Sequence, residues 1–301
     1  MYAPVLISVY TRLKHFKNCV ESLQANELAP ETDLFVVSDA AKYIHHQDSV
    51  NKVREFSQTI QGFKSVTLFA WDENLGSAES VRRARLAIYE KFETQIFMED
   101  DNVVSPLFLT YMNDALNRYR NDEKVFGVCG YNFSDFIPDG YPFDTYFMDK
   151  ISAVGWAGWR AKYMRFLKDY SLPDFNGKAF RRYEKHAPIP ANNLKRMAKQ
   201  GVIWGDTKVS HYLYLEKMVC LFPCKSLVLN TGWDGSGEHC NKNDAWMNMP
   251  INTTMPVKLF PEMTEIDPAW AKQIKQFFSY PFLGKYKTTL YDLKVRLKKQ
   301  M

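Results

Sequence analysis

The sequence predicts an α/β fold with a mostly parallel central sheet flanked by helices. Four short segments rich in β-branched or aromatic residues, 5–10, 33–39, 65–71 and 94–98, have the composition of buried strands. Each of the first three is followed by a segment of helical character, and strands that alternate with helices form parallel sheets. The chain has 301 residues, 46% of them hydrophobic, which is enough for a large packed core.

The clearest predicted helix follows Asn74-Leu75-Gly76, and Ser77 is placed to cap its first turn. Apolar residues at helical spacing give it one face for packing on the sheet: Val81, Ala84, Ile88 and Phe92. Three arginines are expected mostly on its other faces: Arg82, Arg83 and Arg85.

Later segments follow from the same patterns. A second helix is expected after residue 105, with Pro106 in its first turn, and 124–131 has the composition of a further strand. The polar stretch 174–200 is typical of an exposed mobile loop or lid with a short helix. Another helix is expected to begin at Asp267-Pro268 and to run through Phe277.

An acidic triplet, Glu99-Asp100-Asp101, comes directly after the predicted strand 94–98. Open α/β sheets bind ligands at the carboxyl ends of their parallel strands, so the triplet lies where a ligand is expected. Adjacent carboxylates repel one another unless a cation holds them, and carboxylate oxygen suits Mg²⁺ or Mn²⁺. The triplet therefore predicts a site for one of these metals as cofactor, and the alternative is a solvated acidic turn.

Glycine and tryptophan alternate closely in the segment 153–159, which includes Trp156. Glycine lets a backbone approach closely while a flat ring lines the wall, so this composition suits stacking on a sugar or a base. It suits an aromatic core equally well, and the sequence leaves the two interpretations open.

Charge is concentrated at the C-terminal end. Residues 281–301 contain six Lys or Arg and one Asp, a net charge of +5 that equals the net charge of the whole chain. The remaining body is neutral overall, which argues against nucleic acid as a partner. The tail predicts a basic amphipathic helix preceded by aromatic residues, which is typical of a segment that lies on an anionic membrane surface. The alternative is an ordinary packed C-terminal helix.

No uninterrupted apolar stretch approaches the length of a spanning helix, and the N-terminus has no basic targeting region. We therefore expect a cytoplasmic protein, peripheral at the inner face of the cell membrane if the tail binds lipid. The five cysteines lack the spacing of a zinc site and predict buried reduced thiols. His15, His45 and His46 have no supporting context and are interpreted as solvated.

Several segments occur in the order of a known family: Arg12, Ser38-Asp39, Glu73 to Gly76, Ile96 to Asp101, Ser105 to Phe108, Gly130 to Asn132, Gly155-Trp156, Trp204 to Asp206 and Gly237 to His239. In this order they resemble the GT-A glycosyltransferases, most closely the N-acetylglucosaminyltransferase I type with its Glu-Asp-Asp motif, and family 2 glycosyltransferases. The resemblance covers about residues 4 to 240. It implies a Rossmann-like nucleotide-binding sheet with a C-terminal helical extension.

The resemblance also implies roles for individual residues around a nucleotide-sugar donor. Asp101 would bind the divalent cation that bridges the two phosphates, and Asp100 would hold ribose or sugar hydroxyls. Asp39 would accept hydrogen bonds from a pyrimidine base, Arg12 would lie near the nucleotide, and Asn74 would lie in the loop that closes over the donor. Trp156 would belong to the donor-binding wall.

Asp206 aligns with the general base of inverting members of this family. In an inverting reaction the acceptor hydroxyl attacks from the face opposite the leaving diphosphate, so a carboxylate must take its proton there. The alternative for Asp206 is a helix cap, because residues 207–215 predict a helix. His239 would join the metal or the diphosphate, or would be a surface-loop histidine.

The function predicted from these features is metal-dependent, inverting transfer of a hexosyl or N-acetylhexosaminyl group. The donor would be a nucleotide-sugar, with UDP as the expected nucleotide, and the acceptor a glycan or lipid-linked molecule in polysaccharide biosynthesis. Two alternatives stay open: a sugar nucleotidyltransferase, and a non-catalytic carbohydrate- or nucleotide-binding subunit of the same fold. A sugar nucleotidyltransferase would require a glycine-rich loop that ends in a basic residue after the first strand, and residues 8–12 contain no glycine.

The expected domain organisation is a catalytic domain at 1–240, followed by an extension at 241–301 with the basic helix. The catalytic domain would divide into a nucleotide-sugar-binding half, 1–132, and an acceptor and catalytic half, 133–240. Gly205-Asp206 stands where eukaryotic relatives have paired aspartates, and their membrane-spanning stem has no counterpart here. These departures suggest a bacterial-style cytosolic enzyme that acts on a carrier-linked acceptor.

Overall fold

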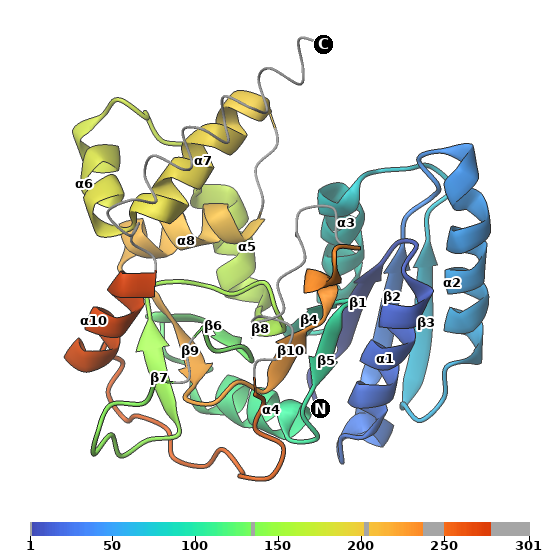
Figure 1. Ribbon diagram of the computed structural model, residues 1–301, viewed down its shortest axis with the longest axis horizontal. Coiled ribbons are helices and arrows are strands. Elements are labelled where there is room, and N and C mark those ends of the chain that lie inside the picture. The colour runs from blue at the N-terminus through green and yellow to red at the C-terminus, as the bar shows by residue number, and fades with distance from the viewer. Residues whose placement is uncertain (1, 134–135, 202–204, 237–249, 278–301) are drawn as a thin grey trace.

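A twisted sheet of eight strands forms the centre of the computed structural model, with the strand order β3-β2-β1-β4-β8-β6-β9-β7 (Figure 1). The structure describes residues 2–133, 136–201, 205–236 and 250–277. The strands are β1 Val5–Val9, β2 Asp33–Ser38, β3 Ser65–Ala70, β4 Thr94–Glu99, β6 Val125–Cys129, β7 Thr145–Met148, β8 Trp156–Trp159 and β9 Val219–Pro223. Only β7 and β8 run antiparallel to their neighbours in this sheet. The predicted α/β fold with a mostly parallel sheet is confirmed.

Helices cover both faces of the sheet because side chains along each strand point alternately to opposite faces. Val5 and Ile7 of β1 belong to one apolar cluster and Leu6 to the other. The first cluster contains residues of α1 Leu13–Gln24, α2 Gln47–Thr59 and α4 Phe108–Arg118. The second contains residues of α3 Ser77–Tyr89, α5 Arg160–Asp169, α8 Gly205–Glu216 and α10 Pro268–Phe277.

The predicted helix after residue 76 exists as α3, but two details of the prediction were wrong. Ser77 is the first helical residue, and the cap position is occupied by Gly76, with φ of 74° and no side-chain capping bond. Arg85 does not face solvent: it is 6% exposed and donates to Gln95 Oε1 at 2.9 Å. Its guanidinium lies 4.8 to 5.1 Å from three aromatic rings, which offset its desolvation by cation–π attraction.

The stretch 174–200 is more ordered than a mobile loop. It forms α6 Lys178–His186 and α7 Pro188–Gln200, which enclose their own small apolar cluster with Phe180, Tyr183 and Leu194 at zero exposure. The helix pair stands above the sheet at the side of α5 and α8 (Figure 1). We call α5 to α8 the helical module.

A short two-stranded ribbon was not expected from the sequence. β5 Asn102–Val104, directly after the acidic triplet, pairs antiparallel with β10 Val228–Asn230. This pairing brings the turn η3 Gly232–Asp234 next to the end of β4. Three-residue strands carry too little pattern to be recognised in a sequence.

No helix within the described ranges is long and apolar enough to cross a membrane. Four cysteines in those ranges, Cys19, Cys129, Cys220 and Cys224, are buried and free, as predicted. The basic tail at 281–301 and Cys240 lie outside the described residues.

Candidate active site

The acidic triplet stands at the carboxyl end of β4, at the edge where β1 also ends. The two strands are parallel neighbours with Ser8 opposite Glu99, and the Asp100 amide donates to Ser8 O at 3.0 Å. Arg12 follows β1 at the start of α1 and therefore reaches the triplet from the adjacent strand. Residues about ninety positions apart in the sequence meet here because parallel strands end at one edge.

Arg12 binds both aspartates of the triplet. Its Nε donates to Asp100 Oδ2 at 3.1 Å, its Nη2 donates to Asp101 Oδ2 at 2.8 Å, and Nη2 also bonds Asp100 Oδ1. Burial disfavours the guanidinium charge, but the hydrogen bonds and charges of Asp100 and then Asp101 outweigh it and raise the pKa of Arg12. Arg12 is therefore a fixed cation between the two carboxylates.

One arginine does not balance the negative charge of this cluster. Burial raises the pKa of Asp100 despite the hydrogen bond from Arg12. Burial, followed by the charges of Asp101, Asp100 and Asp206, raises the pKa of Glu99 to about 8. Further positive charge at the end of β4 would therefore be bound favourably.

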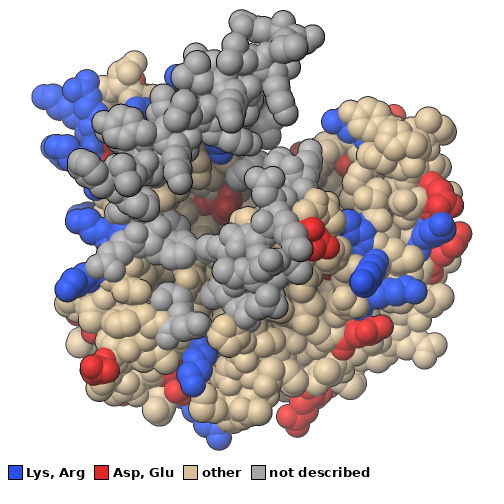
Figure 2. Space-filling model, viewed as in Figure 1, with Lys and Arg blue, Asp and Glu red and all other residues tan. Residues whose placement is uncertain are grey.

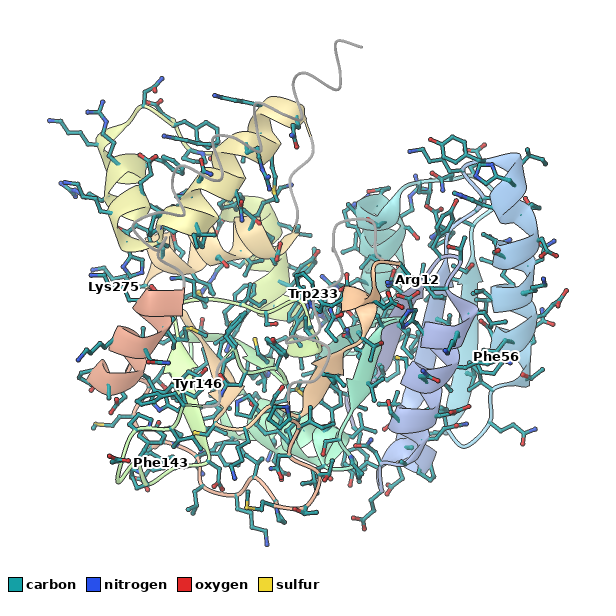
Figure 3. The ribbon with its side chains drawn as sticks, viewed as in Figure 1. Arg12, Phe56, Phe143, Tyr146, Trp233 and Lys275 are labelled. Carbon is teal, nitrogen blue, oxygen red and sulfur yellow. The ribbon has the colours of Figure 1, made fainter. Side chains whose placement is uncertain are left out.

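The carboxylate and the backbone of Asp101 are both held in place. Asn102 Nδ2 donates to Asp101 Oδ1 at 3.0 Å, and Thr231 donates to Asp101 O from its amide at 2.8 Å and from its hydroxyl at 3.0 Å. Gly232 lies so close that a β-carbon on it would be 2.2 Å from Asp101 Oδ2. The β5–β10 ribbon thus presses the turn after β10 onto Asp101, and Figure 3 shows Arg12 beside the turn that carries Trp233.

His15 ties that turn to α1. Its ring nitrogens lie 3.0 Å from Thr231 Oγ1, 3.0 Å from Asp234 Oδ2 and 3.1 Å from Ser236 Oγ. The side chain is 13% exposed, so the prediction of a solvated histidine was wrong for His15. Its partners are more than 200 positions away, and a local pattern cannot show such contacts.

The oxygen-rich set at the end of β4 fits a divalent cation of the Mg²⁺ or Mn²⁺ type. Within the ranges that the structure describes, no three His, Cys, Asp or Glu side chains form a complete metal site. Mg²⁺ in phosphate chemistry needs only one or two protein carboxylates, because phosphate oxygens and water complete its coordination. Asp101 and Asp100 supply these carboxylates, and burial, together with the charges of neighbouring carboxylates, raises the pKa values of Asp100 and Glu99.

Asp39 and Asn74 lie together at the end of β2. Asp39 Oδ1 accepts from the Leu75 amide at 3.0 Å, and Asn74 Nδ2 donates to Asp39 Oδ2 at 3.2 Å and to Ala40 O at 2.7 Å. The carboxylate thus anchors the loop before α3 beside the edge where β1 and β4 end. Two residues expected at the nucleotide are brought into contact.

Asp206 is in the first turn of α8 and is half-buried. Its Oδ1 accepts from the Thr207 amide at 2.7 Å and from the Thr207 hydroxyl at 3.3 Å. Burial raises the pKa of Asp206, and the charge of Asp206 is among the causes that raise the pKa of Glu99. Figure 2 shows a hollow between the two sides of the molecule with acidic side chains inside it.

Trp156 is on β8 and belongs to the core. It is 7% exposed, and the Arg85 guanidinium lies 4.9 Å from its ring centroid. Of the two interpretations that the sequence left open, this placement matches the aromatic core. His239, expected at the metal or the diphosphate, lies outside the described residues.

No protein-family model and no curated protein matches this sequence. Solved structures that resemble the chain include TarS from S. aureus, at 13% identity and a TM-score of 0.39 over 57% of this chain and 30% of TarS. TarS 1–349 in complex with UDP-GlcNAc gives 14% identity and a TM-score of 0.37 over 57% of this chain and 49% of that one. The mannosyltransferase PcManGT from Pyrobaculum calidifontis, in complex with GDP-Man and Mn²⁺, is 13% identical, with a TM-score of 0.41 over 72% of this chain and 70% of that one.

One of these neighbours is in complex with UDP-GlcNAc, and another, a mannosyltransferase, is in complex with GDP-Man and Mn²⁺. The chain matches less than two thirds of the length of the TarS chains. Identities of 12 to 14% and TM-scores of 0.37 to 0.41 do not transfer an activity to this chain. The likeness to the N-acetylglucosaminyltransferase I type stays a prediction.

Proposed function

We propose that this protein is a metal-dependent glycosyltransferase that inverts the anomeric centre of a nucleotide-sugar donor. One observation supports the proposal: a buried cluster of three carboxylates with one arginine ends a parallel strand, and the charge of a further carboxylate, Asp206 on α8, is close enough to raise the pKa of Glu99. Inversion requires two such groups, one at the leaving diphosphate and one at the attacking hydroxyl.

Asp101 and Asp100 would hold the divalent cation, which when bound neutralises charge on a leaving diphosphate. Asn102, Thr231 and Gly232 fix Asp101 through the contacts described above. This preorganisation keeps the carboxylate in place without a reorganisation cost when the donor binds. Arg12 supplies a second, permanent positive charge beside the diphosphate.

Asp206 would take the proton of the acceptor hydroxyl. Burial raises the pKa of Asp206, so its carboxylate is a stronger base than a solvated aspartate. Both hydrogen bonds from Thr207 go to Oδ1 rather than to Oδ2. Oδ2 is therefore the atom assigned to receive the proton.

Asp39 and Asn74 would form the nucleotide end of the site, and a pyrimidine base would accept and donate hydrogen bonds there. The donor class that this arrangement favours is a UDP-sugar. The acceptor would be a glycan or a lipid-linked molecule.

A panel of nucleotide-sugars with Mn²⁺ or EDTA tests the proposal by product formation and by thermal shift. We expect a rise in melting temperature with one UDP-sugar and Mn²⁺, and its loss in EDTA, because a ligand of the native state stabilises it. Asp101→Asn should abolish the shift, whereas Asp48→Asn on the exposed surface of α2 should keep it. Full activity in EDTA would contradict the metal role, and tight UDP binding without any product would favour a non-catalytic subunit.

A further inference from the structure

Helix α6 carries a basic stripe on its exposed face. Lys178, Arg181, Arg182 and Lys185 are spaced i, i+3, i+4 and i+7, and all four are exposed. This spacing puts them on one side of the helix, while Phe180 and Tyr183 of α6 pack with residues of α7 and α8 and are fully buried. Figure 2 shows Lys and Arg side chains along the edge where α6 lies in Figure 1.

The stripe lacks carboxylate partners in the part of the chain that the structure describes. None of its four cations forms an ion pair there, and Glu184, the acidic residue of α6, is bonded to Lys195 at 2.6 Å. Like charges at i, i+3 and i, i+4 repel and destabilise an isolated helix. The apolar face of α6 holds the helix in place. Arg181 donates to the backbone carbonyl of Asn176, at 2.8 Å from Nη2, and no carboxylate within the described residues neutralises the four charges, so they can attract an external anion.

The positive charge is a property of the whole helical module. Residues 160–217 contain thirteen Lys or Arg and five Asp or Glu, a net charge of +8 that exceeds the +5 of the entire chain. Cations in such an arrangement raise the local concentration of an anionic partner and speed its association.

The stripe continues into a pocket of about 480 Å³ between α6 and the end of α8. Arg182, His186 and Lys217 are among the residues that line it. Asp149 is the carboxylate in its wall, and it is already bonded to Lys150 Nζ at 2.7 Å and to His186. The pocket thus adds one cation, Lys217, to the end of the stripe.

The stripe and the proposed base belong to one packed unit. The Tyr183 ring of α6 lies 4.7 Å from the His211 ring and 5.0 Å from the Tyr214 ring of α8. Asp206 begins α8, and Lys217 follows its end, so the pocket lies about 16 Å from the base along the helix. An extended acceptor with its reacting hydroxyl at Asp206 can reach the stripe over that length.

We infer that the basic stripe binds the acceptor, and that the acceptor is an anionic glycan bearing carboxylate, sulfate or phosphate groups. This inference rests on the proposed function and narrows its substrate class. A membrane surface would require large exposed apolar side chains among the cations of the stripe, and α6 has none; the exposed ones of the helical module lie outside α6: Met164, Leu167, Leu172 and Leu215. Single-stranded nucleic acid would require exposed aromatic rings, and the rings of α6 are buried.

Binding of labelled dextran sulfate oligosaccharides, followed by fluorescence anisotropy at low and high salt, tests this inference. The stripe variant Arg181→Gln with Lys185→Gln should bind at least about tenfold more weakly than the unmodified protein. The matched control Lys91→Gln with Lys124→Gln removes two exposed cations outside the stripe and should bind normally. Uncharged dextran of the same length should not bind, and thermal melts should show both variants folded.

If transfer is detected, the stripe variant should raise the KM for an anionic acceptor and leave donor hydrolysis without acceptor unchanged. If the protein binds the sulfated glycan through the stripe but binds no nucleotide-sugar, the proposed function is contradicted, whereas the anionic-glycan site is supported. Equal binding by stripe and control variants would overturn the inference. Stripe-dependent binding that is tighter to phosphatidylglycerol vesicles or to a single-stranded oligonucleotide than to the sulfated glycan would overturn it as well.

Discussion

Gly232 lies against the carboxylate of Asp101 so closely that a β-carbon on residue 232 would be 2.2 Å from Asp101 Oδ2. Real β-carbons do not approach an oxygen that closely, so a side chain here must displace the carboxylate or the turn. The hydrogen bonds from Thr231 to Asp101 O keep the turn where it is. The position of this carboxylate is therefore decided by a residue 131 positions away.

Gly232→Ala should displace the Asp101 carboxylate and weaken UDP binding in the presence of Mn²⁺ by about tenfold or more, equivalent to at least about 1.4 kcal/mol. Isothermal titration calorimetry measures the loss. Gly205→Ala is the matched control, because a β-carbon there meets nothing within 4 Å. Unchanged UDP affinity in Gly232→Ala would show that Asp101 does not contribute to donor binding.

Asp206→Asn should reduce sugar transfer by about 100-fold or more, the range for removal of a general base, and leave donor affinity unchanged. Burial raises the pKa of Asp206. As the pH is lowered, the transfer rate of the unmodified protein should therefore begin to fall at a higher pH than it would with a solvated aspartate as the base. Glu216→Gln at the other end of α8 removes an exposed acid and should transfer normally. A variant that keeps the full transfer rate would assign Asp206 to helix capping alone.

Glu99→Gln should increase stability at high pH in metal-free buffer. The pKa of Glu99 is raised to about 8 by burial and by three neighbouring aspartates, so the folded protein binds a proton that the unfolded chain releases. Stability that depends on Glu99 therefore falls as pH rises from about 4.5 to about 8.

The gain should be roughly 1 kcal/mol or more at pH 8.5 and should shrink below pH 5, as measured by urea unfolding. Glu90→Gln, which alters an exposed acid at the end of α3, is the control and should not change with pH in this way. A gain independent of pH would mean that the Glu99 carboxyl is not the titrating group.

His15→Ala should release the turn after β10 from α1 and weaken UDP and Mn²⁺ binding about three- to tenfold. The substitution removes the contacts of residue 15 with Thr231, Asp234 and Ser236. We therefore also expect the free energy of unfolding to decrease by roughly 1 to 2 kcal/mol. His45→Ala changes an exposed histidine and serves as the control. Asparagine at position 15 should restore part of the affinity if hydrogen bonding to the turn is what matters.

The sheet order shows why some features were predictable. Runs of β-branched and aromatic residues identify β1 to β4, and the boundaries of these strands agree with the structure within one or two residues. β1, β2 and β4 are largely buried, whereas β3 is a partly exposed edge strand. The acidic triplet could be placed at a ligand-binding edge because Glu99 ends a parallel strand. A strand can therefore be recognised from the residues of its own short segment.

Other features had no local pattern. Arg85 was expected mostly away from the core because charge favours solvent, yet three aromatic rings from separate elements surround it. The helices α6 and α7 resembled a polar loop because only one face of each is apolar, and that face finds its partners on α8.

The sequence by itself determined the first four strands with the helices between them, the acidic edge and the candidate aspartates, because burial and charge repulsion act over a few neighbouring residues. The tertiary structure decided which groups meet: Arg12 with Asp100, Gly232 with Asp101, and His15 with Thr231. These pairs depend on the register of β1 beside β4 and of β5 beside β10. Register is fixed by the packing of the whole sheet, so no single segment contains it.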